Sequence, residues 1–210
     1  MLSKTSIELQ AEDTELNSYL ISDSAVDFFH PAIQEQAKML FHSPMNEEET
    51  IKTAFDFVCN EIPHSADIHS CIVSRTASEV LRNKEGICYA KSLLLAAFLR
   101  LKNIPTGFCY QSLRLDGTLN TELVIHALNA VWLSSKKCWM RIDARGNTNG
   151  INAQFIPGEE HLAFDVHPQF GEIDYPVIYA APHPLVIKTL NAFSNCKIMF
   201  QHLPQTLSQS

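Results

Sequence analysis

The sequence predicts an α+β fold, with helices in its first half and an antiparallel sheet in its second. Apolar residues recur at helical spacing up to residue 62 and again from 88 to 101. Two strand-like runs, 124–133 and 138–142, are then separated by only four residues, as in a hairpin. Helices followed by neighbouring antiparallel strands are typical of an α+β domain.

The first helices are predicted within residues 11–62, in at least two segments. Asp23 or Ser24 caps the first segment, since their side chains accept hydrogen bonds from the free N–H groups of a first turn. This helix runs to Leu40, with Pro31 at a break or in a first turn.

A second helix starts in the acidic run 45–49, because carboxylates favour a helix N-terminus, and it ends at Pro63. Residues 64–74 are polar and predict a loop. A short helical turn over 78–83 then brings the chain to Gly86.

The helix predicted over 88–101 is the central one, because its broad apolar stripe indicates burial on more than one side. A strand begins at Gly107, and the pair Asp116-Gly117 predicts a turn. The two hairpin strands follow, joined by residues 134–137. Beyond them the pattern is weaker, and three further elements are expected: strands at 153–156 and 177–179, and a helix at 185–193.

Composition excludes several classes of function. The net charge is −7, and the 16 Lys and Arg residues are scattered, whereas nucleic-acid binders carry a basic stripe. The longest apolar run, 93–99, is far shorter than the roughly 20 residues that cross a bilayer. Six cysteines without a CxxC pair indicate free thiols in a reducing compartment. We therefore predict a cytoplasmic protein with no nucleic-acid partner, no membrane partner and no metal or cofactor.

Cys88 is the candidate nucleophile. It lies in the run EGICYAKS, where Gly86 leads a turn directly into the central helix. A helix N-terminus is where the backbone field favours a thiolate. Free cysteines more often only fill space, which is our interpretation of the other five. Downstream, His126 in VIHALNAVWL and Asp143 in WMRIDARGN complete a set of nucleophile, base and orienter.

Hairpin geometry tests whether the last two residues meet. If the loop is centred near Ser134-Ser135, His126 lies directly opposite Asp143, and their Cβ atoms are about 5 Å apart. If the loop is centred one residue later, His126 lies opposite Arg145 and Asp143 is its diagonal neighbour, still within reach. Both registers allow the imidazole and the carboxylate to interact.

The run TASEVLRNKEGICYAKSLLLAAFLRLKNIPTGFCYQ resembles the core of the transglutaminase-like superfamily, in particular its bacterial cysteine peptidases. That family has four motifs in order: Gly-x-Cys at a helix start, a Gly-Ile-Pro-like turn, His-Ala on a strand and Asp on the next strand. In this sequence they are matched, in the same order, by Gly86–Cys88, Asn103–Pro105, His126-Ala127 and Asp143-Ala144. The resemblance covers roughly residues 50–147 and implies a papain-like cysteine proteinase core. We expect one domain over 1–210, with 148–210 packed on the core as a C-terminal extension.

The resemblance also implies roles and departures. Cys88 is the expected nucleophile, His126 the base and Asp143 the orienter. Many relatives have Trp after His-Ala, where this chain has Leu128, and Pro-Thr after the Asp, where it has Ala144-Arg145, so its substrate is expected to differ from that of crosslinking enzymes. No calcium-loop pattern is present in the sequence, and calcium activation is not expected.

The oxyanion donor predicted first is the backbone N–H of Cys88, at the helix start. Papain-like sites add a second donor, for which Gln111 and Asn60 are candidates and Tyr110 a weaker one; Gln111 is also a candidate for the substrate groove. Ordinary polar surface roles remain open for them.

The run 64–71, HSADIHSC, is a rival constellation, since four of its residues are potential zinc ligands. Its spacing matches no established zinc motif, and a polar loop beside the cleft is the favoured interpretation. Asp67 and His69 are then candidates to line the substrate groove. Arg145 either orients Asp143 or binds a substrate carboxylate, unless it is only an exposed turn residue.

The predicted activity is cysteine-dependent acyl transfer on amide bonds through a thioester, with a peptide or protein as substrate. Hydrolysis, as a protease or deamidase, is favoured, and transamidation stays open. The alternative is a retired enzyme fold that binds peptides or proteins without turnover. The sequence leaves the oligomeric state open.

Overall fold

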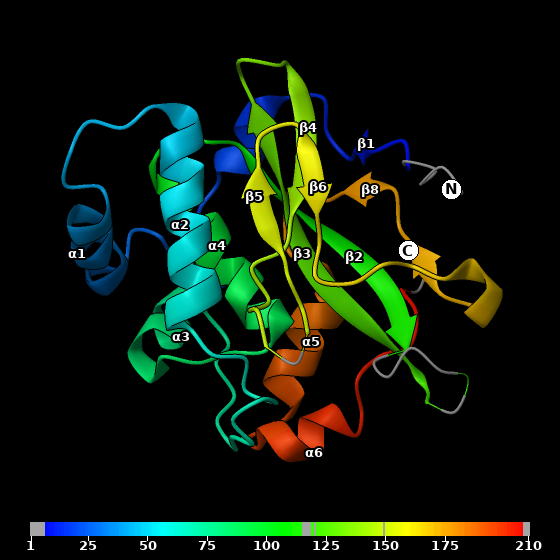
Figure 1. Cartoon of the computed structure of the whole chain (residues 1–210). Coiled ribbons are helices and arrows are strands. Elements are labelled where there is room, and N and C mark those ends of the chain that lie inside the picture. Colours follow the sequence, from blue (N-terminus) through cyan, green and yellow to red (C-terminus); the bar gives the residue numbers. More distant parts are fainter. Residues whose placement is uncertain (1–6, 115–118, 120, 149, 208–210) are drawn as a thin grey trace.

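The computed structural model describes residues 7–114, 119, 121–148 and 150–207, and Figure 1 shows a helical layer beside a sheet. Four helices form the first layer: α1 (Pro31–Leu40), α2 (Glu47–Glu61), α3 (Ala77–Asn83) and α4 (Cys88–Leu101). Helix α4 packs against the other three on one side and against the sheet on the other. Its residues 89–100 are all buried, as expected for the central helix.

The main sheet has four antiparallel strands in the order β4-β3-β2-β7. These strands are β2 (Thr106–Arg114), β3 (Leu123–Leu133), β4 (Cys138–Ile142) and β7 (Ile173–Asp174). The α+β prediction is therefore confirmed, and the central helix and strand β4 have the predicted bounds.

Two small sheets and short helices complete the described chain. Strands β5 (Gln154–Ile156) and β6 (Glu159–His161) form a hairpin, while β1 (Gln10–Ala11) pairs in parallel with β8 (Val177–Ile178). The remaining elements are η1 (Leu16–Leu20), η2 (Pro168–Phe170), α5 (Pro184–Ala192) and α6 (Cys196–Phe200). The strands expected at 153–156 and 177–179 and the helix expected at 185–193 are present to within one residue at each end.

The N-terminal segment differs from the prediction. Residues 11–30 form no α-helix, and α1 begins at Pro31, whose ring suits a first turn because it lacks an N–H group. The cap is His30, whose Nδ1 accepts from the backbone N–H of Ala32. The Asp23 carboxylate instead accepts two backbone N–H groups of a turn, so its local hydrogen bonds compete with helix formation. The turn predicted at 116–117 lies outside the described residues.

Helix α2 has a cap at each end. The Asn46 side chain accepts from the N–H of Glu49, and the Glu49 carboxylate accepts from the N–H of Asn46, which together form a capping box. At the other end the ammonium of Lys91, on α4, donates to the carbonyls of Val58 and Ile62. The central helix is thus joined to α2 by a buried cation as well as by apolar contacts.

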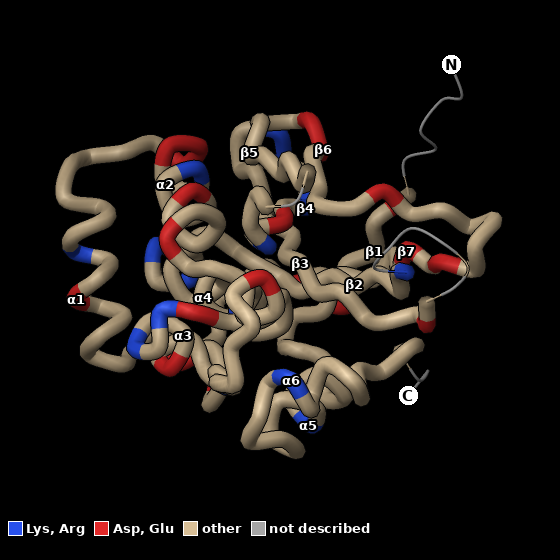
Figure 2. Tube along the Cα trace, turned by 60° about the horizontal axis from the view of Figure 1, so that its bottom comes forward, with Lys and Arg blue, Asp and Glu red and all other residues tan. Residues whose placement is uncertain are grey.

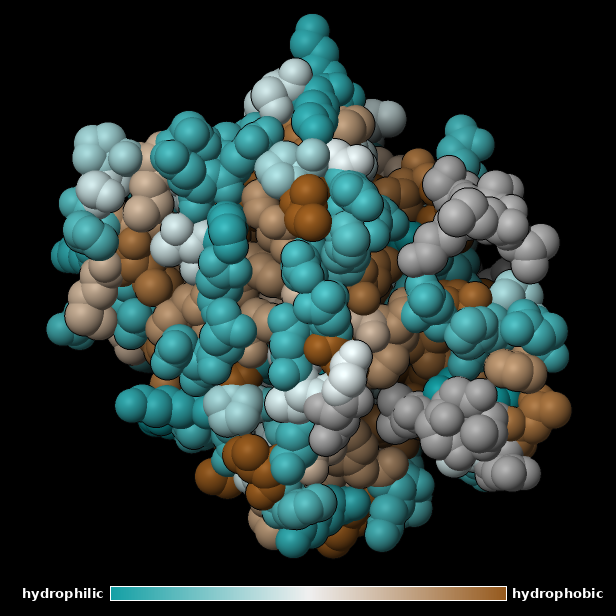
Figure 3. Space-filling view, in the orientation of Figure 1, coloured by the Kyte–Doolittle hydropathy of each residue, from teal (hydrophilic) through white to brown (hydrophobic). Residues whose placement is uncertain are grey.

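The surface agrees with the composition. Figure 2 shows Lys and Arg spread along the chain, and in Figure 3 hydrophilic residues alternate with small apolar groups over the visible face. Within the described ranges no helix is long and apolar enough to cross a membrane.

Candidate active site

Cys88 is the first residue of α4 and is half-buried. The preceding turn is tight: a Cβ atom on Gly86 would lie 3.0 Å from the Cβ of Ala90, so a side chain there would press on the first turn of the helix. Gly86 also pairs with His64 in an isolated bridge. The glycine therefore leaves room for the first turn of the helix, and its backbone joins that turn to the loop at residue 64.

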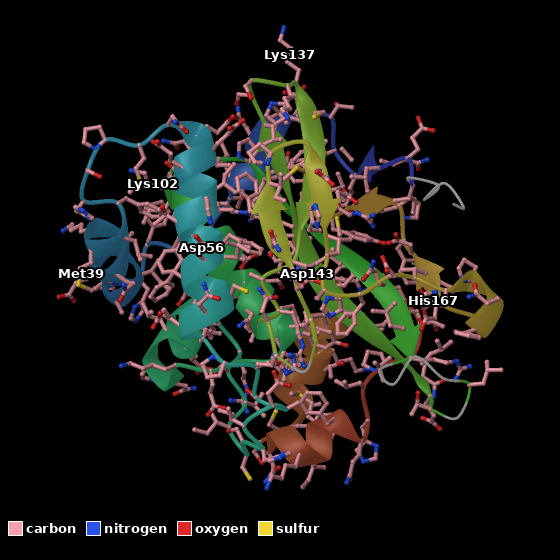
Figure 4. The ribbon with its side chains drawn as sticks, viewed as in Figure 1. Met39, Asp56, Lys102, Lys137, Asp143 and His167 are labelled. Carbon is pink, nitrogen blue, oxygen red and sulfur yellow. The ribbon has the colours of Figure 1, made fainter. Side chains whose placement is uncertain are left out.

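His126 and Asp143 are in contact. His126 lies on β3 and Asp143 directly follows β4, and the Nε2 atom of the ring is 2.8 Å from Oδ2 of the carboxylate. Asn129 pairs with Ile142, so the hairpin loop is centred between Ser135 and Lys136, which is the later of the two predicted registers. Figure 4 places Asp143 near the middle of the molecule.

Asp143 is held as a carboxylate. Its side chain is 1 % exposed, and it accepts backbone N–H groups from Arg145 and Ala163, each at 3.1 Å. Burial alone would raise the pKa of Asp143, but His126 and these two N–H groups outweigh it and lower the pKa.

His126 is an imidazolium at neutral pH. Burial disfavours the charged ring, but the Asp143 carboxylate and the Cys88 sulfur outweigh burial and raise the pKa of His126 to about 10. Nε2 faces Asp143, and Cys88 is the second group that interacts with the ring and raises its pKa. The Phe164 ring packs edge-on against the imidazole, with centroids 5.0 Å apart. The structure therefore brings the thiol, the imidazole and the carboxylate into one chain of contacts.

A second buried cation lies close to this group. Lys91, one turn after Cys88 on α4, is 1 % exposed, and burial lowers its pKa to about 8. Its ammonium donates to the carbonyls of Val58 and Ile62 and contributes positive charge near the site.

The predicted oxyanion donor is already bonded. The backbone N–H of Cys88 donates to Nε2 of His64 at 3.1 Å, whereas the sequence led us to expect a free N–H. Of the second donors considered, Asn60 is exposed on α2, and the Tyr110 hydroxyl accepts from the backbone N–H of His183. Gln111 is buried directly opposite His126 in the sheet, and its Nε2 lies 3.5 Å from Asp174.

The residues expected in the groove form an ion pair. The Arg145 guanidinium donates twice to the Asp67 carboxylate, at 2.6 and 2.8 Å, and Thr148 donates to the same carboxylate. Burial alone would raise the pKa of Asp67, but hydrogen bonds from Arg145 and Thr148 lower it. His69 is exposed, with a left-handed backbone. Among the described residues no three His, Cys, Asp or Glu side chains cluster as a metal site would require, so the 64–71 loop does not assemble a zinc site.

Three contacts were not foreseen: the ring of His64, the N–H of Ala163 and the ring of Phe164. His64 was considered only as a metal ligand, although it bridges 24 positions to Cys88. Ala163 and Phe164 lie in a segment with no periodic pattern, so nothing local indicated that it returns to Asp143 and His126.

The sequence and fold resemble those of known proteins. The transglutaminase-like superfamily model matches residues 34–144, more than half of the 210 residues. The chain belongs to the transglutaminase-like superfamily. Its fold also resembles that of a proposed cysteine protease from Cytophaga hutchinsonii, with 18% identity and a TM-score of 0.50.

That alignment covers 63% of this chain but only 43% of the other, so the transglutaminase-like chain spans less than half of that structure. A crystal structure of a TGase aligns with 17% identity and a TM-score of 0.44, over 63% of this chain and 34% of its own. A search of curated proteins gave no significant match.

Proposed function

We propose that the protein is a cysteine-dependent acyl-transfer enzyme that acts on amide bonds of peptides or proteins. The observation that carries the proposal is the His126 ring, held 2.8 Å from the buried Asp143 and hydrogen-bonded on its other side to Cys88. Membership of the transglutaminase-like superfamily supports the same chemistry. Cys88 is the nucleophile, His126 the base and acid, and Asp143 the orienter.

In this mechanism His126 carries its proton before the substrate binds, and Asp143 stabilises the imidazolium. The Cys88 sulfur forms a bond to the amide carbon, and the carbonyl electron pair moves to oxygen. The C–N bond then breaks, and the leaving nitrogen takes the proton from His126. A thioester on Cys88 and a free amine or ammonia result.

The acyl group is resolved by water or by an amine. We favour water, which gives a protease or deamidase, because residues that flank the histidine and aspartate motifs differ from those of crosslinking relatives. Incubating the wild type and Cys88→Ala with a peptide library and a labelled amine, followed by mass spectrometry, distinguishes cleavage, deamidation and amine incorporation. Peptides retained by Cys88→Ala and unchanged by the wild type would instead identify a binding module.

Alkylation tests the nucleophile directly. Iodoacetamide should modify Cys88 faster than the exposed Cys71 and Cys138, which serve as internal references within the same protein. In His126→Ala, Cys88 should no longer react faster than Cys71 and Cys138, because the base is gone. His69→Ala is the control, since it removes an exposed histidine, and Cys88 should still react faster in it. Peptide mass spectrometry after timed quenching gives the three rates. Equal Cys88 labelling in the wild type and His126→Ala would contradict the activated pair.

A further inference from the structure

His64 covers the backbone N–H of Cys88, which is the oxyanion donor predicted first from the sequence. Its Nε2 atom accepts the Cys88 backbone N–H at 3.1 Å, and its Nδ1 atom lies 3.3 Å from the backbone N–H of Ala66. The side chain is 6 % exposed, and the ring of Phe200 packs edge-on against it. The imidazole is therefore held between two backbone donors.

One neutral imidazole cannot accept from both donors at once, because only one of its nitrogens carries a free lone pair. Burial, reinforced by the positive charge of Arg145, lowers the pKa of His64 well below its usual value, so the ring is neutral. In one tautomer Nε2 accepts from Cys88 and the Ala66 N–H has no acceptor on the ring. In the other tautomer Nδ1 accepts from Ala66, and Nε2 carries a proton that points toward the Cys88 N–H.

In the second tautomer Nε2–H of His64 and the backbone N–H of Cys88 are both donors, and they need an acceptor between them. An oxygen that develops negative charge beside the Cys88 sulfur supplies one, because the Cys88 N–H lies at the start of the same helix. The Cys88 nitrogen and Nε2 of His64 are 3.1 Å apart in the structure. Two nitrogens that both donate to one oxygen, each at about 2.9 Å from it, must be further apart than this. The His64 ring must therefore rotate away from Cys88 when the oxygen binds. The backbone of His64 is fixed by its bridge to Gly86, which confines that movement to the side chain.

We propose that His64 is the second oxyanion donor, with Nε2–H of His64 and N–H of Cys88 binding the oxygen of the tetrahedral intermediate. This inference rests on the acyl-transfer function proposed above. In the resting protein the ring covers the Cys88 N–H, and the substrate oxygen displaces it. The Ala66 N–H then holds the donating tautomer.

The test separates two reactions of the same thiol. Acylation of Cys88 by p-nitrophenyl acetate passes through an oxyanion, whereas alkylation by iodoacetamide is a displacement at carbon that forms none. Both rates are measured at Cys88 by mass spectrometry in the wild type, His64→Leu and His64→Gln. Leucine has no donor, and glutamine places an N–H₂ group on a side chain of similar reach.

We expect acylation to fall about 100-fold or more in His64→Leu, the range for loss of an oxyanion donor, while alkylation changes less than about threefold. His64→Gln should recover a substantial part of the acylation rate.

Two results would overturn the proposal. One is an acylation rate in His64→Leu equal to that of the wild type. The other is an equal loss in the acylation and alkylation rates, which would indicate that His64 only positions Cys88. Slow alkylation in the wild type itself would reject the proposed function instead. Circular dichroism shows whether His64→Leu folds. If it does not, His64→Gln alone decides: a fall of about 100-fold or more in its acylation rate would overturn the proposal.

Discussion

His126 is a buried imidazole that stays charged, and this charge determines the electrostatics of the site. Its side chain is 3 % exposed, which disfavours the imidazolium, yet Asp143 and Cys88 raise its pKa to about 10. The charged ring can donate from both nitrogens, to the carboxylate on one side and to the sulfur on the other. A site arranged in this way has its proton in place before the substrate arrives.

This pKa shift predicts a pH dependence of stability. Because the pKa of His126 is about 10 in the folded protein and 6.5 in its ordinary state, its contribution is complete below pH 6.5 and is lost as pH rises toward 10. Between pH 6.5 and 8 the wild type should lose about 1 kcal/mol of unfolding free energy per pH unit more than His126→Gln. Urea unfolding of both proteins at several pH values measures the difference.

Lys91 adds a pH dependence of the opposite sign. Its pKa is lowered to about 8, so its folded state loses the proton before its unfolded state does. The wild type and His126→Gln both carry this lysine, so its contribution cancels from the difference between them. Parallel stability curves for the two proteins between pH 6.5 and 8 would contradict a net uptake of a proton at His126 on folding.

The sequence predicted this pair because a hairpin is local. His126 and Asp143 are separated by a turn whose register allows only a few arrangements, and contact was expected in both that were considered. His64 could not be predicted in the same way. Its contact with Cys88 depends on how the 64–74 loop closes and on its backbone bridge to Gly86, and the spacing of residues in the sequence indicates neither.

At the scale of elements, α4 is positioned by polar contacts as well as by its apolar surface. Lys91 and Arg100, both on its buried length, donate to backbone carbonyls of other elements, among them Val58 on α2 and Thr106 on β2. The last carbonyls of a helix have no partner within it, so a buried ammonium is an effective cap for α2. The nucleophile helix is thereby fixed to the layers on both sides.

Lys91→Met tests this cap. The substitution keeps the apolar stem and removes the ammonium, which leaves buried carbonyls of α2 without their donor. We expect a loss of about 1–3 kcal/mol in the free energy of unfolding, measured by urea titration. Lys52→Met is the control, because Lys52 is exposed on α2 and pairs with Asp56 across one turn; its effect should stay within about 0.5 kcal/mol. Equal effects of the two variants would contradict the cap.

The elements also show where a sequence pattern is informative. Helix α4 and strand β4 have the predicted bounds, because apolar spacing, a proline stop and a four-residue turn all act over short distances. Residues 11–30 were wrongly predicted to be helical, because the hydrogen bonds made by the Asp23 side chain favour a turn there. β1 could not be predicted, since its partner β8 lies more than 160 residues along the chain.

At the scale of the whole molecule, the Asp67–Arg145 pair links the helical layer to the segment that follows β4. Asp67 lies in the loop that carries His64, and the backbone N–H of Arg145 donates to Asp143. Two parallel hydrogen bonds between a guanidinium and a carboxylate fix both distance and orientation. The pair therefore holds the His64 loop in position beside the His126–Asp143 contact.

Arg145→Lys should weaken this link although the charge is kept, because an ammonium cannot make the two parallel bonds. We expect a loss of about 1–2 kcal/mol in unfolding free energy, in the range for hydrogen bonds to charged groups. Arg82→Lys is the matched control: Arg82 is 70% exposed, lies 3.6 Å from Glu79 and should change stability by less than about 0.5 kcal/mol. Thermal and urea unfolding of both variants measure these changes. Equal losses of unfolding free energy in Arg145→Lys and Arg82→Lys would contradict a structural role for the Asp67–Arg145 pair.

The β3–β4 hairpin has a practical consequence. Five residue pairs hold the register that brings His126 to Asp143. Figure 4 shows Lys137, on that turn, at the edge of the molecule and well away from Asp143. A peptide tag or an immobilising linker inserted between residues 134 and 137 would therefore anchor the protein to a surface and leave the Cys88 end open to large substrates.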